Sequence, residues 1–208
     1  SCGNEYLASF ARRENPNVIV VPTTINRFPL QNKASRKRTE EIVIGWTGSH
    51  STLKYLTTLM PVLKSIQDKY PKTSFLVIAD RNPDLPLKNY HFRKWNLHTE
   101  IADLEAIDIG IMPLPDDEWT RGKCGFKALQ YMAMSIPAII SPVGVNRQIV
   151  THGIEGFLCS TFEQWFDCLE DLILDESKRI HMGEKGRQKV IGFYSAEANS
   201  SRFLSLFQ

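Results

Sequence analysis

From residue 42 onward, short apolar stretches alternate with stretches in which apolar residues recur at helical spacing. The apolar stretches predict strands, and recurrence every three or four residues predicts helices. Alternation of this kind is typical of βαβ units, so the sequence predicts an α/β fold with a Rossmann-like parallel sheet and helices on both faces. Ligands of such sheets bind at the carboxyl ends of the strands. We expect strands at 42–46, 74–79, 91–92, 107–112, 138–141 and 156–159, and helices over 53–66, 101–104, 126–136, 162–173, 177–192 and 195–207.

The composition narrows the class of protein. The chain has 208 residues, 42% of them hydrophobic, and a formal net charge of +2, so nothing in its charge requires nucleic acid as a partner. It lacks both a signal-peptide pattern at its start and an apolar run of roughly 18 residues, the length of a membrane helix. The four cysteines show no C-x-x-C spacing, which argues against zinc and against a disulfide framework. We therefore expect a cytoplasmic protein.

The first 41 residues differ in character from the rest. Residues 3–8 have a helical pattern, and the apolar residues 18–21 predict a short strand that ends at Pro22. Residues 31–40 are polar and strongly charged, as in a solvated linker.

Residues 121–137 predict an anion site. A turn that contains Gly122 and Gly125 leads into a helix, and helix starts bring unpaired N–H groups and the positive end of a dipole. Glycine lets a ligand approach the backbone closely, so a phosphate is the simplest ligand for this segment. The cations of the segment are Arg121, Lys123 and Lys127, and the apolar stripe of its helix consists of Phe126, Leu129, Met132, Ala133 and Ile136.

A second helix start of the same kind follows the strand at 42–46. Gly48 permits a tight turn, Ser49 is a good helix cap, and Lys54 lies on the helix that follows. An ordinary capped turn is the alternative interpretation. Neither a G-x-G-x-x-G dinucleotide pattern nor a Walker A pattern occurs, which counts against dehydrogenases and P-loop enzymes.

Three further features have open interpretations. The acids at 116–118 suggest metal ligands or a general base, although a solvated acidic loop has the same pattern. His50 is suited to donate a hydrogen bond to a ligand, or to a purely structural role. Cys124 lies at a helix start, which lowers the pKa of a thiol, or it is simply a small residue that fits there.

The segment 122–141 resembles the donor-site motif of the retaining, two-domain (GT-B type) glycosyltransferases of the glycosyl transferases group 1 family. That motif reads Glu-Gly-Phe-Gly-Leu-Pro-x-Leu-Glu-Ala-Met-Ala-x-Gly-x-Pro, and it aligns with Gly125, Leu129, Met132-Ala133 and Pro137. The resemblance covers nearly the whole chain. It also includes residues 44–54, 108–114, 141–146 and 152–157, and the segments 3–8 and 21–26, which are similar to the junction between the two domains.

The chain departs from this pattern at four positions. The two glutamates of the motif fall on Gly122 and Gln130; the resemblance implies that the first contacts the transferred sugar and the second the donor ribose. Gln130 retains a hydrogen-bonding side chain, but Gly122 does not. Lys127 stands where the family usually has proline. The arginine that the family has before the phosphate lysine is missing, and Gly48 lies six residues before Lys54. These differences suggest a distinct subgroup.

The resemblance implies the donor-binding half of such an enzyme. Residues 1–30 would be the end of an acceptor domain, 31–41 a charged linker, 42–192 a Rossmann-like nucleotide-sugar-binding domain and 193–208 a closing helix. The parent enzyme would transfer a sugar to a glycan or lipid-linked acceptor, as in polysaccharide biosynthesis, with the parent peripheral at a membrane surface. The partners would be a UDP- or GDP-sugar and an N-terminal acceptor domain. This chain alone would be inactive.

The site residues implied by this resemblance divide by the part of the donor they contact. We expect Lys54 and Lys127 to be catalytic, because they would stabilise the charge that develops on the departing diphosphate without a required metal or cofactor. The base would bind near Lys94 and Trp95, unless Trp95 belongs to the core, and the ribose would bind Gln130. Arg121 and Gly122 would lie on the sugar side. The phosphates would contact Gly48, Ser49, His50, Lys54, Lys123, Gly125, Phe126 and Lys127.

Two alternatives belong to other functional classes. One is a non-catalytic nucleotide-sugar-binding subunit or sensor, which Gly122 and Gln130 favour. The other is a general phosphate-binding module, which only the generic chemistry of the helix starts favours.

Overall fold

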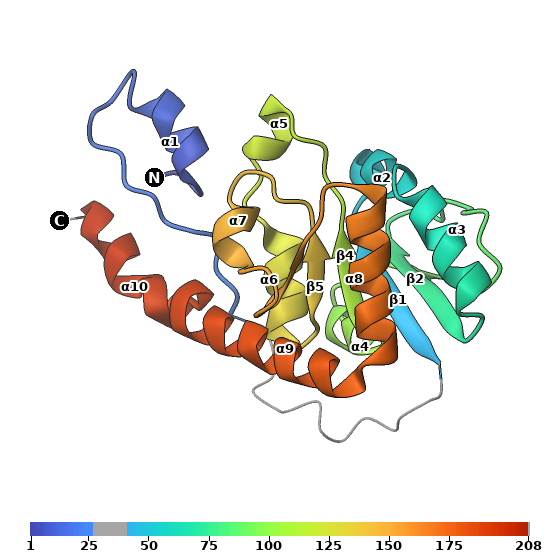
Figure 1. Ribbon diagram of the computed structural model, residues 1–208. Helices are drawn as coiled ribbons and strands as arrows, with labels where there is room; N and C mark the ends of the chain where they lie inside the picture. The colour runs from blue at the N-terminus through green and yellow to red at the C-terminus, as the bar shows by residue number, and fades with distance from the viewer. Residues whose placement is uncertain (27–40, 208) are drawn as a thin grey trace.

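The computed structural model describes residues 1–26 and 41–207, and its centre is a parallel sheet (Figure 1). This sheet has six strands in the order β3-β2-β1-β4-β5-β6, and every neighbouring pair is parallel. The predicted α/β fold with a Rossmann-like sheet is confirmed. The strands are β1 (Ile42–Thr47), β2 (Thr73–Ala79), β3 (Tyr90–Lys94), β4 (Ile109–Met112), β5 (Ala138–Ile140) and β6 (Gly156–Leu158).

Helices cover both faces of the sheet, as the sequence predicts (Figure 1). Along β2 the side chains alternate between two hydrophobic clusters: Phe75 and Val77 join one, Leu76 and Ile78 the other. The first cluster includes residues of α2 (His50–Thr57), α3 (Met60–Lys69) and α8 (Phe162–Leu174). The second includes residues of α4 (Glu100–Glu105) and α6 (Phe126–Ala133). Burial on both sides explains why the strands are apolar throughout.

The predicted helix over 53–66 is two helices in the structure. α2 ends at Thr57 and α3 begins at Met60, with Pro61 in the first turn of α3. Proline has no N–H to donate and its ring clashes with the preceding turn, so the helix restarts there. The apolar spacing stays in phase across the break, and for this reason periodicity alone did not reveal it.

The N-terminal segment contains α1 (Glu5–Ala11) but not the strand predicted at 18–21. Val20 forms only an isolated bridge with Cys2. The prediction was wrong because this segment pairs with the chain start and not with an edge of the sheet. The linker predicted at 31–41 lies outside the described residues except for Glu41, and the proposed division into domains stays a prediction.

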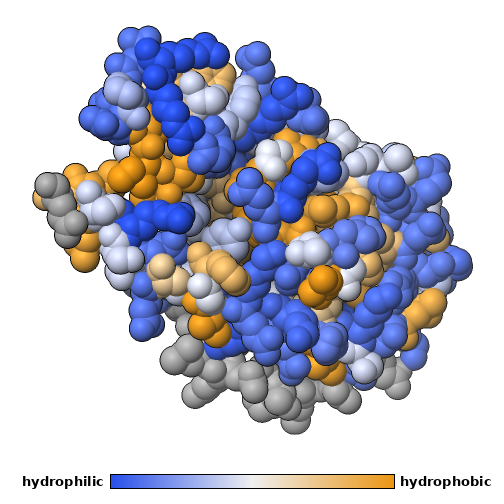
Figure 2. Space-filling model, turned by 60° about the vertical axis from the view of Figure 1, so that its left-hand side comes forward, coloured by the Kyte–Doolittle hydropathy of each residue, from blue (hydrophilic) through white to orange (hydrophobic). Residues whose placement is uncertain are grey.

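The C-terminal helices run across the molecule (Figure 1). α9 (Glu176–Lys189) continues into a π-helical turn (Val190–Tyr194). The extended residue Ser195 then starts α10 (Ala196–Leu204), which a 3₁₀ turn (Ser205–Phe207) follows. Figure 2 shows apolar surface beside this end of the chain, where Phe203, Leu204 and Phe207 are exposed. Over the ranges 1–26 and 41–207, no helix has the length and apolar character that crossing a membrane requires.

Candidate functional site

A pocket of about 320 Å³ opens at the carboxyl ends of the central strands. The strand order reverses between β1 and β4, and ligands of open α/β sheets bind at such a point. The pocket brings together the two helix starts that the sequence predicts as anion sites. Its walls come from the turn after β1 (Gly48, Ser49, Thr52), the end of β4 (Met112, Leu114) and the start of α6 (Lys123, Cys124, Gly125, Phe126, Lys127).

The start of α6 is built for close approach of a ligand. Gly125 is the N-cap residue, with a left-handed φ of 68° that side-chain-bearing residues rarely adopt. A Cβ at this position would lie 2.1 Å from Cδ1 of Ile149, so substitution is blocked by packing as well. Because glycine has no side chain to cap the helix, the first N–H groups of α6 are available to an anion.

Lys127 is the most enclosed cation of the pocket. Its ammonium lies 3.4 Å from Oγ1 of Thr52 and 5.1 Å from the ring centroid of Trp46. Burial, and to a smaller extent the nearby charge of Lys123, lower the pKa of Lys127 to about 8. Because no carboxylate is among these neighbours, an anion entering the pocket would gain a full charge–charge interaction.

Lys123 and Phe126 complete the α6 side of the pocket. The ammonium of Lys123 lies over the rings of Tyr55 and Trp119, at 5.8 and 5.7 Å. Phe126 is 49% exposed, so its predicted place in the apolar stripe of the helix is wrong; Leu129, Met132, Ala133 and Ile136 are buried as predicted. Phe126 follows Gly125 directly and therefore lies at the rim, whereas the stripe begins one turn later.

The start of α2 forms the opposite wall. The N–H of Ser49 donates to Oγ1 of Thr52, 3.2 Å away, and this hydroxyl in turn accepts from Lys127. Lys54 is exposed, with its ammonium 5.2 Å from the ring of Tyr55, and it does not line the pocket. Its catalytic role stays a prediction.

His50 is held by Asp80, which follows β2. Nδ1 of His50 lies 2.6 Å from one carboxylate oxygen of Asp80, and the backbone N–H of His50 donates to the other at 2.7 Å. The hydrogen bond from His50 lowers the pKa of the Asp80 carboxyl. An Asp80 carboxylate that accepts from Nδ1–H would leave Nε2 for a ligand.

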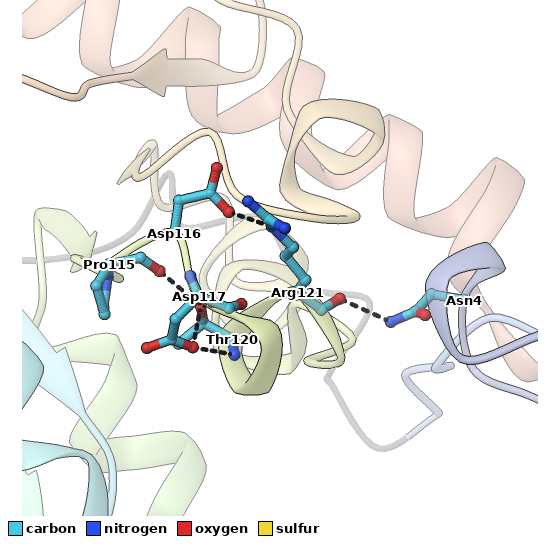
Figure 3. A network of polar contacts seen from close by, with 6 residues as sticks. All are labelled: Asn4, Pro115, Asp116, Asp117, Thr120 and Arg121. Carbon is cyan, nitrogen blue, oxygen red and sulfur yellow. Dashed lines mark hydrogen bonds and ion pairs between the residues drawn. The ribbon is translucent and has the colours of Figure 1, made fainter. Parts of the chain in front are cut away.

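The acidic residues before the motif serve the local structure. Asp117 caps α5 (Glu118–Arg121), because its carboxylate accepts from the N–H of Thr120 at 2.7 Å. Asp116 pairs with Nε of Arg121 at 2.6 Å, which lowers the pKa of Asp116 (Figure 3). Arg121, predicted to lie on the sugar side, is thus already ion-paired. Within residues 1–26 and 41–207, no group of histidine, cysteine or acidic side chains is placed to hold a metal ion.

Asn4 joins the chain start to the loop between α5 and α6 (Figure 3). The residue is 4% exposed, and its amide donates to the carbonyls of Gly122 at 3.1 Å and Lys123 at 3.2 Å. Its Oδ1 accepts from the N–H of Leu7 and so caps α1. Gly122 packs near α1, because a Cβ on it would lie 3.3 Å from Cδ2 of Leu7.

The hydroxyl of Tyr131 joins β1 and β4, the two central strands whose ends lead into the pocket. This hydroxyl accepts from the N–H of Thr47 at 2.9 Å and donates to the carbonyl of Ile111 at 3.3 Å. The ring lies against Gly110, where a Cβ would come within 2.4 Å of it. Burial raises the pKa of Tyr131, so the hydroxyl remains a donor at neutral pH.

The residues predicted for ribose and base meet at Glu100, which the sequence analysis did not single out. One oxygen of Glu100, Oε1, accepts from Nε2 of Gln130 and from Nε1 of Trp95, both at 3.0 Å. Gln130 is 3% exposed, whereas Trp95 is 43% exposed and therefore not a core residue. Lys94, at the end of β3, is exposed. The only trace of Glu100 in the sequence pattern is an acidic residue at the start of the predicted helix that follows β3.

One protein-family model matches most of the chain. A model of the family described as glycosyl transferases group 1 matches residues 41–175. The search of curated proteins found no match.

Several solved structures share the fold at low sequence identity. Sucrose-phosphate synthase from Thermosynechococcus elongatus matches with a TM-score of 0.78 and 17% identity, over 99% of this chain and 56% of that one. The C-terminal domain of a glycosyl transferase group 1 family protein (LpcC) from Francisella tularensis matches with a TM-score of 0.56 and 22% identity, over 74% of this chain and 86% of that one. HepE from Anabaena, in complex with UDP and glucose, matches with a TM-score of 0.67 and 14% identity, over 81% of this chain and 49% of that one. The chain thus spans about half the length of the synthase structure.

Proposed function

Because the chain belongs to the glycosyl transferases group 1 family, we propose that it is the nucleotide-diphosphate-sugar-binding domain of a retaining glycosyltransferase. Its parent transfers the sugar to a glycan or a lipid-linked acceptor. The structure with the same fold that holds UDP and glucose supports a uridine nucleotide as the first ligand to test.

The observation that carries this proposal is the pocket between two helix starts, with Lys127 enclosed between them. A diphosphate placed there accepts from the N–H groups of α6 and faces the positive ends of two helix dipoles. When the bond from the sugar to the diphosphate breaks, negative charge grows on the departing phosphate oxygen. The fixed dipoles and the ammonium of Lys127 stabilise that charge.

Calorimetric titration with UDP and GDP in the presence of EDTA tests the proposal. We expect binding of at least one of the two without added metal, because the helix starts and lysines supply the positive charge. Inorganic pyrophosphate serves as the base-free and ribose-free control. Failure of both nucleotides at millimolar concentration, or binding only after Mn²⁺ or Mg²⁺ is added, would contradict the proposal.

A second candidate is a nucleotide-sugar sensor without transfer activity. Gly122 favours it, because no side chain stands where the family motif has its sugar-contacting glutamate, and Arg121 beside it is paired with Asp116. Both functions predict donor binding. Transfer of sugar by the full-length parent separates them, since a sensor binds the donor and leaves it intact.

A further inference from the structure

The carboxylate of Glu100, at the start of α4, has no role assigned so far and is hydrogen-bonded to Gln130 of α6, the helix that begins at the pocket. It is partly buried and joins two elements far apart in the chain, β3 with its following loop and α6. The hydrogen bonds from Trp95 and Gln130 fall on the same oxygen, Oε1. Within the described part of the chain, the other oxygen, Oε2, accepts no hydrogen bond.

The loop that presents Glu100 is fixed at three points. Nη1 of Arg93 pairs with Asp103 at 3.0 Å, Oγ1 of Thr99 donates to Asp103 at 2.7 Å, and the indole of Trp95 donates to Glu100 at 3.0 Å. The indole N–H is therefore occupied while much of the ring remains exposed. A ring held at its edge in this way offers a face on which a flat heterocycle can stack.

Gln130 connects this loop to the anion pocket. It lies three residues after Lys127 on α6, so the two side chains are neighbours along one side of the helix. Its amide points to Glu100 and not to open solvent, because Gln130 is 3% exposed. A row of four side chains thus leads from the cation of the pocket to the exposed ring: Lys127, Gln130, Glu100 and Trp95.

We propose that Glu100 is the group that binds the ribose diol of the nucleotide, with Gln130 and Trp95 as its positioning residues. The inference rests on the proposed function. A carboxylate oxygen with no protein donor accepts from a hydroxyl, and hydrogen bonds to charged groups are the stronger kind. The amide of Gln130 and the indole of Trp95 hold the carboxylate in place, so it is oriented before the nucleotide arrives.

This inference changes the expected effect of Gln130→Glu. The family resemblance alone predicts that restoring the glutamate of the motif is tolerated or improves binding. In the structure, the new carboxylate would stand where Nε2 of Gln130 now lies 3.0 Å from Oε1 of Glu100. Two like charges at that distance repel each other, so we expect weaker nucleotide binding. Combining Glu100→Gln with Gln130→Glu exchanges the donor and the acceptor and should recover much of the loss.

The test compares binding of UDP and GDP with binding of their 2′,3′-dideoxy forms, together with pyrophosphate. For the wild type we expect the dideoxy form of the bound nucleotide to bind at least about tenfold more weakly than the normal form. Glu100→Ala should bring this ratio close to one and leave pyrophosphate binding within about twofold. Glu105→Ala, on the same helix and exposed, should change neither value.

The outcomes separate this proposal from the proposed function. If the wild type binds no nucleotide more tightly than pyrophosphate, the proposed function fails and the role of Glu100 with it. If the wild type prefers the normal nucleotide and Glu100→Ala keeps that preference, only the role of Glu100 is refuted. The Glu100→Gln variant, whose shape is nearly unchanged, repeats the comparison should Glu100→Ala fail to fold; an undiminished ribose preference in it would also refute the proposal.

Discussion

At the level of single residues, Lys127 is a cation that the folded chain partly removes from water. Its pKa is lowered to about 8 by burial and by Lys123, below the ordinary value of 10.5. Between these two values the unfolded chain holds a proton that the folded chain does not, so the contribution of Lys127 to the free energy of unfolding rises with pH across this window. Below about pH 8 both states are charged, and the folded state bears the full desolvation cost.

The first prediction follows from this balance. Lys127→Met should raise the free energy of unfolding at pH 7 and flatten its rise between about pH 8 and 10.5, as measured by chemical denaturation at several pH values. Diphosphate binding should weaken roughly 10- to 100-fold, because a charge-assisted hydrogen bond is lost. Lys64→Met, an exposed lysine on α3, is the matched control. Equal pH profiles for wild type and Lys127→Met would show that Lys127 is not desolvated.

At the level of the elements, Tyr131 fixes the distance between α6 and the central strands. Tyr131→Phe leaves the N–H of Thr47 without its partner at a buried position just before the turn of the pocket. An unsatisfied buried donor costs about 1–3 kcal/mol, and we expect a loss of that size in the free energy of unfolding. Tyr6→Phe on α1 should change it by less than about 0.5 kcal/mol. A loss no larger than that of the control would mean that water replaces the hydroxyl.

The sequence predicts regular elements well because their signals are local. Apolar runs locate the strands and Gly125 locates the start of α6, since each depends on a few neighbouring residues. The predictions failed where partners distant in sequence decide. Val20 pairs with Cys2 and not with the sheet. Phe126 is exposed because it lines the pocket instead of packing in the core.

The sequence likewise predicts one part of the candidate site, the two helix starts, and not another, Glu100. The two helix starts carry recognisable residues, so the pocket they form follows from a parallel sheet once its strand order is known. Glu100 was missed because its partners Trp95 and Gln130 come from different elements, and Gln130 is 30 residues away. A lone glutamate at the start of a short helix has no periodic signature.

At the level of the whole molecule, Asn4 connects the beginning of the chain to the loop of the pocket, 118 residues away. Asn4→Ala removes both the cap of α1 and the donors to Gly122 and Lys123, and we expect a loss of about 1–3 kcal/mol in the free energy of unfolding. Nucleotide affinity should fall several-fold, because the loop before α6 loses its anchor. Asn15→Ala, an exposed asparagine, should change neither quantity measurably.

A companion variant separates the two roles of Asn4. Asn4→Asp keeps an acceptor for the N–H of Leu7 but donates nothing to the carbonyls of the loop. If the connection to the loop matters, Asn4→Asp should weaken nucleotide binding at least as much as Asn4→Ala. Wild-type affinity in Asn4→Asp would show that only the cap of α1 is important.

The last prediction concerns transfer by this chain. In our proposal the groups around the pocket act on the donor, because two helix starts and the ammonium of Lys127 would bind and stabilise its diphosphate. Transfer also needs an acceptor hydroxyl held within about 3–3.5 Å of the reacting carbon, because positioning supplies much of the rate. Because our proposal makes this chain the donor-binding domain of its parent, it assigns the acceptor-side groups to another domain. The 208-residue chain should therefore release UDP or GDP from the matching nucleotide-sugar at the same slow rate with and without glycan or lipid-linked acceptors, as followed by coupled assay of the released nucleotide. Acceptor-stimulated release, with a new glycoside detected by mass spectrometry, would show that this chain alone completes the enzyme.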